Sequence, residues 1–97
     1  MITTICNAIK QRELIEFNYN GFYRKVEPHT LGVSKKGNDL LVAYQVEGGS
    51  KEGKVPDWKQ FNLEKIERLN TLDEAFEEPR SGYKKGDSRM IKIYCEL

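Results

Sequence analysis

The sequence predicts a mainly β (α+β) fold, in which an N-terminal helix precedes a small, strongly bent antiparallel barrel with an extra C-terminal strand. The chain has 97 residues, enough for one domain with a single modest core. Its apolar residues follow a helical spacing at first and alternate with polar residues from Leu14 onward. The alternating segments are joined mostly by short turns without intervening helices, which excludes a parallel crossover fold.

The first expected element is a helix over residues 3–12, TTICNAIKQR. Ile5, Ala8 and Ile9 share one face of this helix, and a threonine at its start is available as the N-cap. The helix is therefore expected to cover one side of the barrel.

The next two elements are strands that form a hairpin. The segment 14–19, LIEFNY, alternates apolar and polar residues, as a strand with one buried face does. Asn20-Gly21 supplies two residues that tolerate a positive φ, so a tight turn is expected before a second strand over 22–33.

The second strand has an unusual composition, because a basic pair and an acidic residue precede a proline. Phe22, Val26 and Leu31 are its candidate core residues. Pro28 cannot donate a hydrogen bond to a neighbouring strand and is expected to force a bulge or an edge. His29 is expected to be a surface or turn residue.

The remaining elements follow from turn residues and apolar runs. They are, in order, a turn at 35–38, a strand over 39–46 with nearly continuous apolar residues, a long hairpin loop at 48–57, an alternating segment WKQFNL, a segment EKIERLNTL with Ile66, Leu69 and Leu72, and a last strand MIKIYCEL.

The charge distribution suggests a division of the chain into a barrel with its helix, residues 1–79, and a basic tail ending in a strand, residues 80–97. The net charge is only +1. The tail carries five Lys/Arg against two Asp/Glu, whereas residues 48–79 carry five against eight. Such runs are either solvated surface or a binding face.

Several classes of protein are disfavoured by what the sequence lacks. No apolar run is long enough to span a membrane and no signal-peptide centre is present, so a cytoplasmic location is expected. Cys6 and Cys95 are the only cysteines, and a disulfide between them would not be expected in a reducing compartment. With two cysteines and one histidine, no recognisable structural zinc set can be assembled. A catalytic triad would have to use His29, and nothing around His29 looks like a nucleophile's turn or a base with its orienting partner. GGSKEGK lacks the spacing of a phosphate-binding glycine loop. An enzyme, a metal site and a cofactor are therefore not expected.

The order of several short motifs resembles the WYL domain family over about residues 5–76. The matching positions are Ala8-Ile9, Phe17 and Tyr19, the element Arg24, Val26, Glu27, Pro28 and Leu31, the pair Ala43-Tyr44, and the element Lys59, Phe61, Leu63, Lys65 and Ile66. The chain departs from the family at the naming triplet, which aligns with Asp39-Leu40-Leu41, and at two positions where lysine replaces the arginine that the family prefers. A stand-alone WYL-like domain is the resulting interpretation.

The resemblance implies a fold similar to an SH3- or Sm-like barrel and a role in bacterial regulation. It implies that a basic concavity senses a nucleic acid or nucleotide-like anionic effector and so modulates a transcription or defence system. The residues carried over are Arg24, Lys59 and Lys65 as anion contacts, with Tyr19 and Tyr44 as stacking or hydrogen-bonding partners. Single-stranded nucleic acid is the expected partner, and Trp58 is a further candidate for base stacking.

Two alternatives stay open at this point. The basic residues could be ordinary surface charges with Glu27 as their ion-pair partner, and Tyr19, Tyr44 and Phe61 could be core residues. The domain could instead be a protein-interaction or homo-oligomerisation module, such as a homodimer, in which the C-terminal strand joins the sheet edge of a partner or of a second copy.

Overall fold

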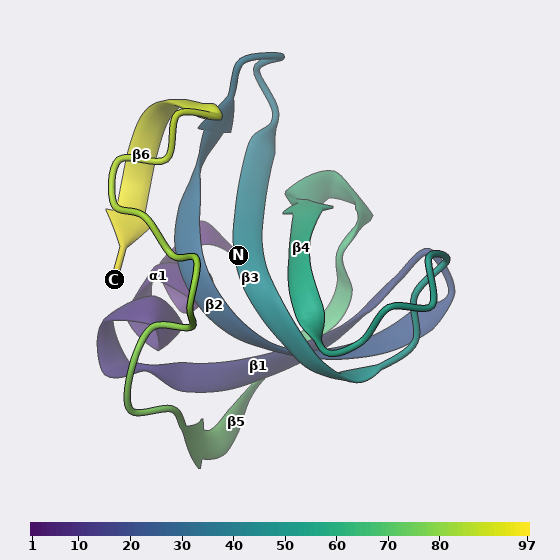
Figure 1. The fold of residues 1–97 in the computed structure, drawn as a ribbon. Helices are drawn as coiled ribbons and strands as arrows, with labels where there is room; N and C mark the ends of the chain where they lie inside the picture. The colour runs from purple at the N-terminus through teal and green to yellow at the C-terminus, as the bar shows by residue number, and fades with distance from the viewer.

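The computed structural model describes residues 1–97 and consists of one helix and a six-stranded antiparallel sheet (Figure 1). The elements in chain order are α1 (Ile2–Gln11), β1 (Glu13–Tyr19), β2 (Phe22–Ser34), β3 (Asp39–Gly48), β4 (Asp57–Asn62), the 3-10 helix η1 (Leu63–Lys65), β5 (Glu67–Ala75) and β6 (Met90–Glu96). The prediction of a mainly β fold with an N-terminal helix is confirmed.

The sheet is strongly curved but does not close into a barrel. Its strand order is β4-β3-β2-β1-β5, and β6 pairs with β2 beside this path. The long strand β2 makes this branching possible, because residues 22–26 pair with β1 and residues 30–34 pair with β6 on the same edge. No pairing joins β4 to β5, so the sheet has two free ends.

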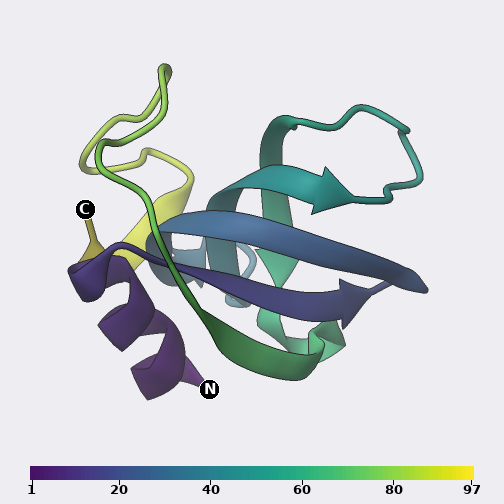
Figure 2. The same ribbon diagram turned by 90° about the horizontal axis from the view of Figure 1, so that it is seen from below.

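Helix α1 packs against the sheet with the face that its sequence predicts. Ile5, Ala8 and Ile9 are buried in the main core. Arg12 ends the helix in the left-handed conformation, and its backbone N–H donates to the carbonyl oxygens of Ala8 and Ile9. Figure 2 shows the helix on the opposite side of the sheet from the loop before β4. It is neither long nor apolar enough to cross a membrane.

The β1–β2 hairpin has the predicted tight turn. Asn20 and Gly21 both have positive φ, 51° and 80°, as a two-residue hairpin turn of the primed type requires. The prediction that Phe22 is a core residue is wrong, because its side chain is 37% exposed. It lies at the very end of the hairpin, where the space beneath the sheet is occupied by the Arg24 side chain rather than by apolar residues.

Pro28 sits beside a bulge, as expected. It pairs with Ala43, while the next paired residue of β2 is Thr30, so His29 is the extra residue of the strand. His29 is 0% exposed, and its assignment to the surface or a turn is wrong. The bulge directs the His29 ring toward the chain between β5 and β6, where it contacts Phe76 and Tyr83. The alternation of residues along the strand does not predict this direction.

The main core lies on the concave side of the sheet, beneath α1. Thirteen buried residues form it, with Phe17, Tyr19 and Phe61 in edge-to-face contacts at centroid distances of 4.9 to 6.5 Å. Val26 and Leu31, both predicted core residues, belong to it. Tyr19 and Phe61 are therefore core residues as well as residues near the hairpin end.

A second, smaller cluster forms on the convex side, under residues 76–83, which we call the strap. The His29 ring contacts Phe76, Tyr83 and Trp58 at centroid distances of 5.4, 5.4 and 4.6 Å. The indole N–H of Trp58 donates to the Ser81 carbonyl at 2.9 Å. The strap thus covers the bulge in β2 and leads into β6.

Cys6 of α1 and Cys95 of β6 form a disulfide, with their Cα atoms 5.7 Å apart. The expectation that these two cysteines do not form a disulfide is wrong, because the chain has no free cysteine. Helix α1 packs on β6, so residues separated by 89 positions meet. Their sequence separation gave no sign of this proximity.

Candidate anion-binding site

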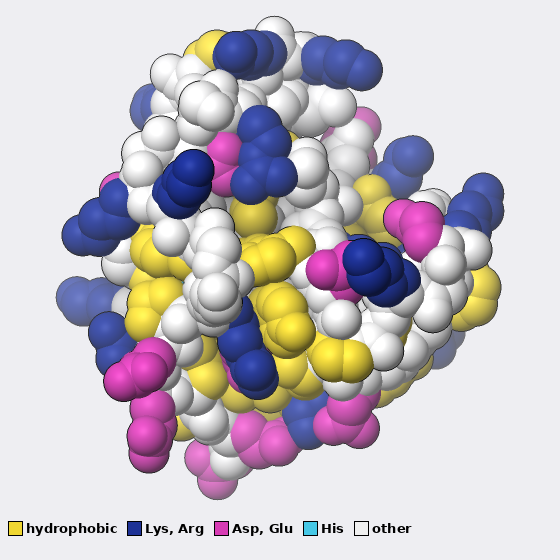
Figure 3. Space-filling model, viewed as in Figure 1, with side chains coloured by type: hydrophobic (Ala, Val, Ile, Leu, Met, Phe, Trp, Pro, Cys, Tyr) yellow, Lys and Arg dark blue, Asp and Glu magenta, His cyan; other side chains and the backbone are white.

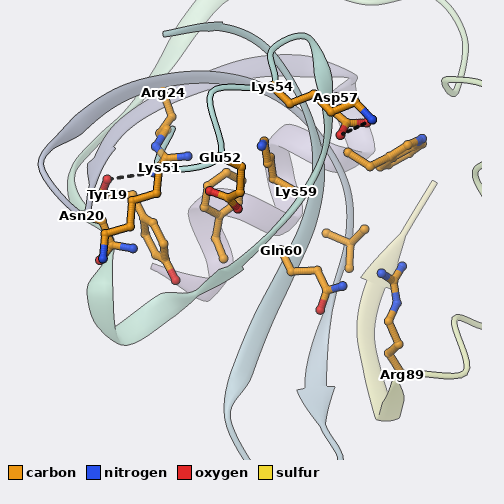
Figure 4. Close-up of a pocket in the computed structure, with 13 residues that line it drawn as sticks. Tyr19, Asn20, Arg24, Lys51, Glu52, Lys54, Asp57, Lys59, Gln60 and Arg89 are labelled. Carbon is orange, nitrogen blue, oxygen red and sulfur yellow. Dashed lines mark hydrogen bonds and ion pairs between the residues drawn. The ribbon is translucent and has the colours of Figure 1, made fainter. Parts of the chain in front are cut away.

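A cavity of about 750 Å³ opens between the β1–β2 turn, the loop 49–56 and β4 (Figure 4). Its basic lining residues outnumber its acidic ones by five to two: Arg24, Lys51, Lys54, Lys59 and Arg89 against Glu52 and Asp57. Lys54 and Asp57 form an ion pair at 3.8 Å. The cavity therefore has an excess of positive charge within a chain of nearly zero net charge.

Arg24 enters this cavity from β2 and is 4% exposed. Its Nη1 donates to Gln45 Oε1 at 3.2 Å and its Nη2 donates to the Tyr19 carbonyl at 3.1 Å. Its Nε is buried and has no hydrogen-bond partner. The guanidinium lies over the rings of Tyr19 and Phe61, at 5.4 and 5.6 Å from their centroids.

The charge of Arg24 is poorly compensated. Burial lowers the pKa of its guanidinium, against the attraction of the Glu52 carboxylate. An arginine remains protonated in proteins all the same, because its pKa is so high. No carboxylate forms a salt bridge with Arg24, so a buried cation stands with one N–H unsatisfied.

Lys59 approaches the same space from β4. It pairs with Ala43 across the sheet and so lies on the concave side. Its Nζ donates to Ser50 Oγ at 3.1 Å. The Ser50 hydroxyl also accepts from the Glu52 backbone N–H at 3.2 Å and lies 3.1 Å from Glu52 Oε2, to which it donates.

Glu52 is an acidic residue that lies among these basic side chains, between Lys51 and Lys59 in Figure 4. Its pKa is lowered by a hydrogen bond from its own backbone amide, by the Ser50 hydroxyl, and by the charges of Lys59 and Arg24. Glu52 is therefore a carboxylate at neutral pH, in a position where an anionic ligand would meet it.

Tyr19 contributes the wall of the cavity. Its hydroxyl accepts a hydrogen bond from the Asn62 backbone N–H at 3.0 Å, which ties the hairpin end to the end of β4. Its ring is packed in the core. The structure thus brings together Arg24, Lys59 and Tyr19 of the predicted site residues.

The other two predicted site residues lie elsewhere. Tyr44 is on the convex side, with its ring 4.7 Å from the Arg80 guanidinium carbon and edge-on to Trp58 at 5.6 Å. Lys65 is exposed at the end of η1 and does not line the cavity. Tyr44 lies on the convex side because successive residues of β3 point to opposite sides of the sheet. Lys65 lies outside the cavity because η1 separates it from β4.

Glu27 does not form an ion pair with the basic residues of the predicted site. Its carboxylate accepts two hydrogen bonds from Arg80, at 2.7 Å from Nε and 2.9 Å from Nη2. Glu27 and Arg24 are separated by three residues on a strand and so point to opposite sides of the sheet. Arg24 is left without its expected partner for this reason.

Sequence reasoning missed Ser50, Glu52 and Gln45 as parts of the site. Gln45 is buried, and its amide nitrogen donates to the carbonyl oxygens of Glu47 and Gly49, which fixes the start of the loop. A glutamine in an otherwise apolar strand was the available signal. No group of three or more His, Cys, Asp or Glu side chains is arranged so that it could hold a metal ion.

The fold and this cavity define a small β protein with a cavity rich in basic residues at the open end of a curved sheet. Comparisons with protein-family models, curated proteins and solved structures find no match. The similarity to WYL domains therefore enters the functional argument as part of a proposal.

Proposed function

We propose that this protein is a non-enzymatic binding module, resembling WYL domains, that takes a nucleic acid or nucleotide-like anion into the cavity around Arg24 and Lys59. Binding would modulate a transcription or defence system, as the resemblance implies. The observation that carries the proposal is the buried Arg24 guanidinium, whose Nε has no partner and which no carboxylate neutralises.

A phosphate group would complete this arrangement. Leaving a buried charged donor unsatisfied costs about 1–3 kcal/mol or more. A ligand oxygen would recover this energy after a shift of the side chains that now exclude solvent from Nε. Arginine and phosphate form short, charge-assisted hydrogen bonds of matching geometry. Lys51, Lys54 and Lys59 surround the same space and would add further positive charge.

Two finer features belong to the same proposal. The curved sheet is an opened relative of an SH3- or Sm-like barrel, with β4 and β5 as the strands that would otherwise meet. The location is the cytoplasm, as for the bacterial regulators that the chain resembles. The disulfide opposes this location, because such bonds are rare in reducing compartments. Rapid alkylation of thiols in expressing cells, followed by mass spectrometry, decides this point: protein with both cysteines alkylated supports the cytoplasm.

Fluorescence anisotropy with labelled single-stranded DNA and RNA tests the proposed site. Replacing Arg24 by alanine should weaken binding about 10- to 150-fold, the equivalent of about 1.5–3 kcal/mol for hydrogen bonds to a charged group. Lys59→Ala should also weaken binding, whereas Lys65→Ala, the same change outside the cavity, should not. Circular dichroism would confirm that each variant is folded.

Unchanged affinity in the folded Arg24→Ala protein would contradict the site assignment. So would an equal loss in Lys59→Ala and Lys65→Ala, because general charge would then explain binding. If Arg24→Ala does not fold, the two lysine variants still decide between the cavity and the rest of the surface.

A second candidate function is assembly through sheet edges, including homodimer formation. Ile91 of β6 is 66% exposed, and the outer strands β4 and β5 each have a free edge. Strand β6 itself already pairs with β2 of the same chain. Light scattering over a concentration series tests assembly: a mass above the 11.3 kDa monomer that falls on Ile91→Glu supports it, and a monomer mass throughout contradicts it.

A further inference from the structure

We propose that residues 84–89 build a second anion subsite that adjoins the first, and that the ligand spanning both is a single-stranded oligonucleotide. This inference rests on the proposed function and adds the ligand's extent and a part of the chain outside the resemblance to WYL domains. It is carried by the shape, the charge and the aromatic content of the surface between the loop 49–56 and the C-terminal segment.

The second subsite is a cavity of about 510 Å³ between the convex side of the sheet and the segment 82–89. It shares three lining residues with the first cavity, namely Val42, Trp58 and Arg89. The two cavities therefore meet at a common wall. Each has the size of a site for one small ligand, and together they form a longer binding surface than a mononucleotide needs.

The unpaired charges of the second cavity belong to two lysines. Lys84 and Lys85 are exposed lining residues, and neither forms a salt bridge. Arg89 is neutralised by Asp87, to whose Oδ1 its Nε donates at 2.9 Å. The positive charges of the second cavity that are free to contact a ligand are therefore those of Lys84 and Lys85. Lys54 and Lys59 line the first cavity, beyond the shared wall.

The segment that presents these lysines is held in place on both sides. The Tyr83 hydroxyl donates to the Leu97 carbonyl at 2.7 Å, and the Gly86 backbone N–H donates to Glu96 Oε2 at 3.0 Å. The Arg89 backbone N–H donates to Asp87 Oδ1 at 3.0 Å and so closes the segment. The lysine pair therefore extends from an anchored loop next to β6.

The surface between the two basic regions is aromatic. Trp58 lines both cavities, with Tyr83 beside it in the second, whereas the Tyr19 ring at the first is packed in the core. Figure 3 shows hydrophobic surface at the centre of this face, with Lys and Arg side chains above it and beside it. Aromatic side chains between basic groups are typical of single-strand binding, where bases stack on rings while the phosphates lie along cations. An acidic peptide would use the charges but not the rings.

The dimensions limit the length of the strand. The molecule measures 29 × 28 × 24 Å, and the proposed surface occupies part of one face. Domains of this size contact about 4 nucleotides at the lower end of the known range. We therefore expect affinity to rise with length up to about four to six nucleotides and then to level off.

Anisotropy competition with dTMP and with oligo(dT) of two to ten nucleotides tests the inference. The wild-type protein should bind a hexamer at least 10-fold more tightly than dTMP. A Lys84→Ser/Lys85→Ser variant should lose most of that gain while keeping its affinity for dTMP. Its salt dependence should be shallower by about 1.4 in log K against log [salt], for two lost phosphate contacts.

The control is a Lys35→Ser/Lys36→Ser variant, which makes the same charge change at an adjacent exposed pair in the β2–β3 turn. It should retain the dependence on length. Equal losses in the two double variants, or affinity independent of length in the wild type, would overturn the second subsite. A poly-glutamate chain of equal charge that competes as well as the hexamer would overturn the nucleic-acid assignment.

The same binding experiments distinguish an error in the second subsite from an error in the proposed function. Binding of dTMP that depends on Arg24 but not on ligand length contradicts only the second subsite. No binding of dTMP or any oligonucleotide by the wild type contradicts both. Length-dependent binding that is sensitive to Lys84 and Lys85 but insensitive to Arg24 supports the second subsite and contradicts the first.

Discussion

Glu52 occupies the position that an anionic ligand would need, so it is an internal competitor for the proposed site. Its carboxylate is held by Ser50 and lies near Lys59 and Arg24. Glu52→Gln keeps the shape of the side chain and removes the charge. We expect it to strengthen the binding of dTMP or oligo(dT) about two- to fivefold, in keeping with the small energies of exposed charge pairs.

Glu67→Gln is the matched control for this prediction, because it removes an exposed carboxylate on β5 outside the cavity. Anisotropy titrations of both variants at one salt concentration provide the measurement. Equal or weaker binding by Glu52→Gln than by the control would mean that Glu52 only orders the loop 49–56.

His29 makes the stability of the fold depend on pH. Its Nδ1 lies 2.8 Å from the Glu27 carbonyl and therefore donates, and its Nε2 accepts from the Arg80 backbone N–H at 3.1 Å. The second contact requires the neutral ring, because Nε2 accepts a hydrogen bond only when it carries no proton. Burial lowers the pKa of His29, and the Arg80 charge lowers it further, against the opposing effects of Glu27.

The direction of the pH effect follows from this lowered pKa. The unfolded chain binds a proton at His29 near pH 6.5, whereas the folded chain does so only at lower pH. The contribution of the neutral ring is complete above about pH 6.5 and is lost as the pH falls below it, at no more than about 1.4 kcal/mol per pH unit. Urea denaturation at pH 7.5 and pH 5.5 measures it. A His29→Gln variant should show a smaller pH effect, and equal effects in both proteins would contradict the assignment.

At the scale of single residues, the sequence was most informative about side chains whose chemistry suits one kind of partner, such as an arginine and an anion. Arg24 and Lys59 were predicted as anion contacts from the resemblance, and the structure places both in one cavity. His29 was misplaced, because its burial comes from a strap that is distant in sequence. Ser50 and Glu52 were missed because a glycine- and lysine-rich loop has no period from which the direction of a side chain can be read.

At the scale of elements, the strap owes its position to the contact between Arg80 and Glu27. The Glu27 carboxylate is buried, and Arg80 also stacks on the Tyr44 ring. Arg80→Ala would leave Glu27 buried without its cation, so we expect a loss of about 1–3 kcal/mol of unfolding free energy. Chemical denaturation of this variant and of Arg80→Ala/Glu27→Gln tests the mechanism, because the second change should restore part of the loss.

Lys54→Ala is the control for the strap, since it removes an exposed ion pair with Asp57 at 3.8 Å. Its effect on stability should be under about 0.5 kcal/mol. Equal effects of Arg80→Ala and Lys54→Ala would show that the strap is held by its aromatic contacts rather than by the ion pair.

The elements themselves were predictable where local chemistry determines them. The helix, the Asn20-Gly21 turn, the bulge beside Pro28 and the last strand all follow from patterns within about ten residues. The open sheet could not be predicted in this way, because closure depends on whether β4 reaches β5. The charged runs around the strap were read as either solvated surface or a binding face, and only the tertiary structure shows Phe76 packed on His29.

At the scale of the whole molecule, the two ends of the chain are joined covalently. The disulfide between Cys6 and Cys95 fixes α1 against β6, and β6 in turn pairs with the half of β2 that carries Leu31. A truncation after residue 79 would remove this strand and the disulfide together. It would therefore report on stability as much as on assembly, and for this reason single substitutions are the better tests of both proposed functions.

The disulfide should contribute substantially to stability because the loop that it closes contains nearly the whole chain. A crosslink over a separation of 89 residues restricts the unfolded state strongly, and native disulfides typically contribute about 2–4 kcal/mol. Guanidinium denaturation with and without a reducing agent should show a loss of this size. The Cys6→Ser/Cys95→Ser protein should resemble the reduced wild type and be insensitive to the reductant. A reduced protein as stable as the oxidised one would show that packing of α1 on β6 alone holds the two ends together, and that the fold is equally suited to a reducing compartment.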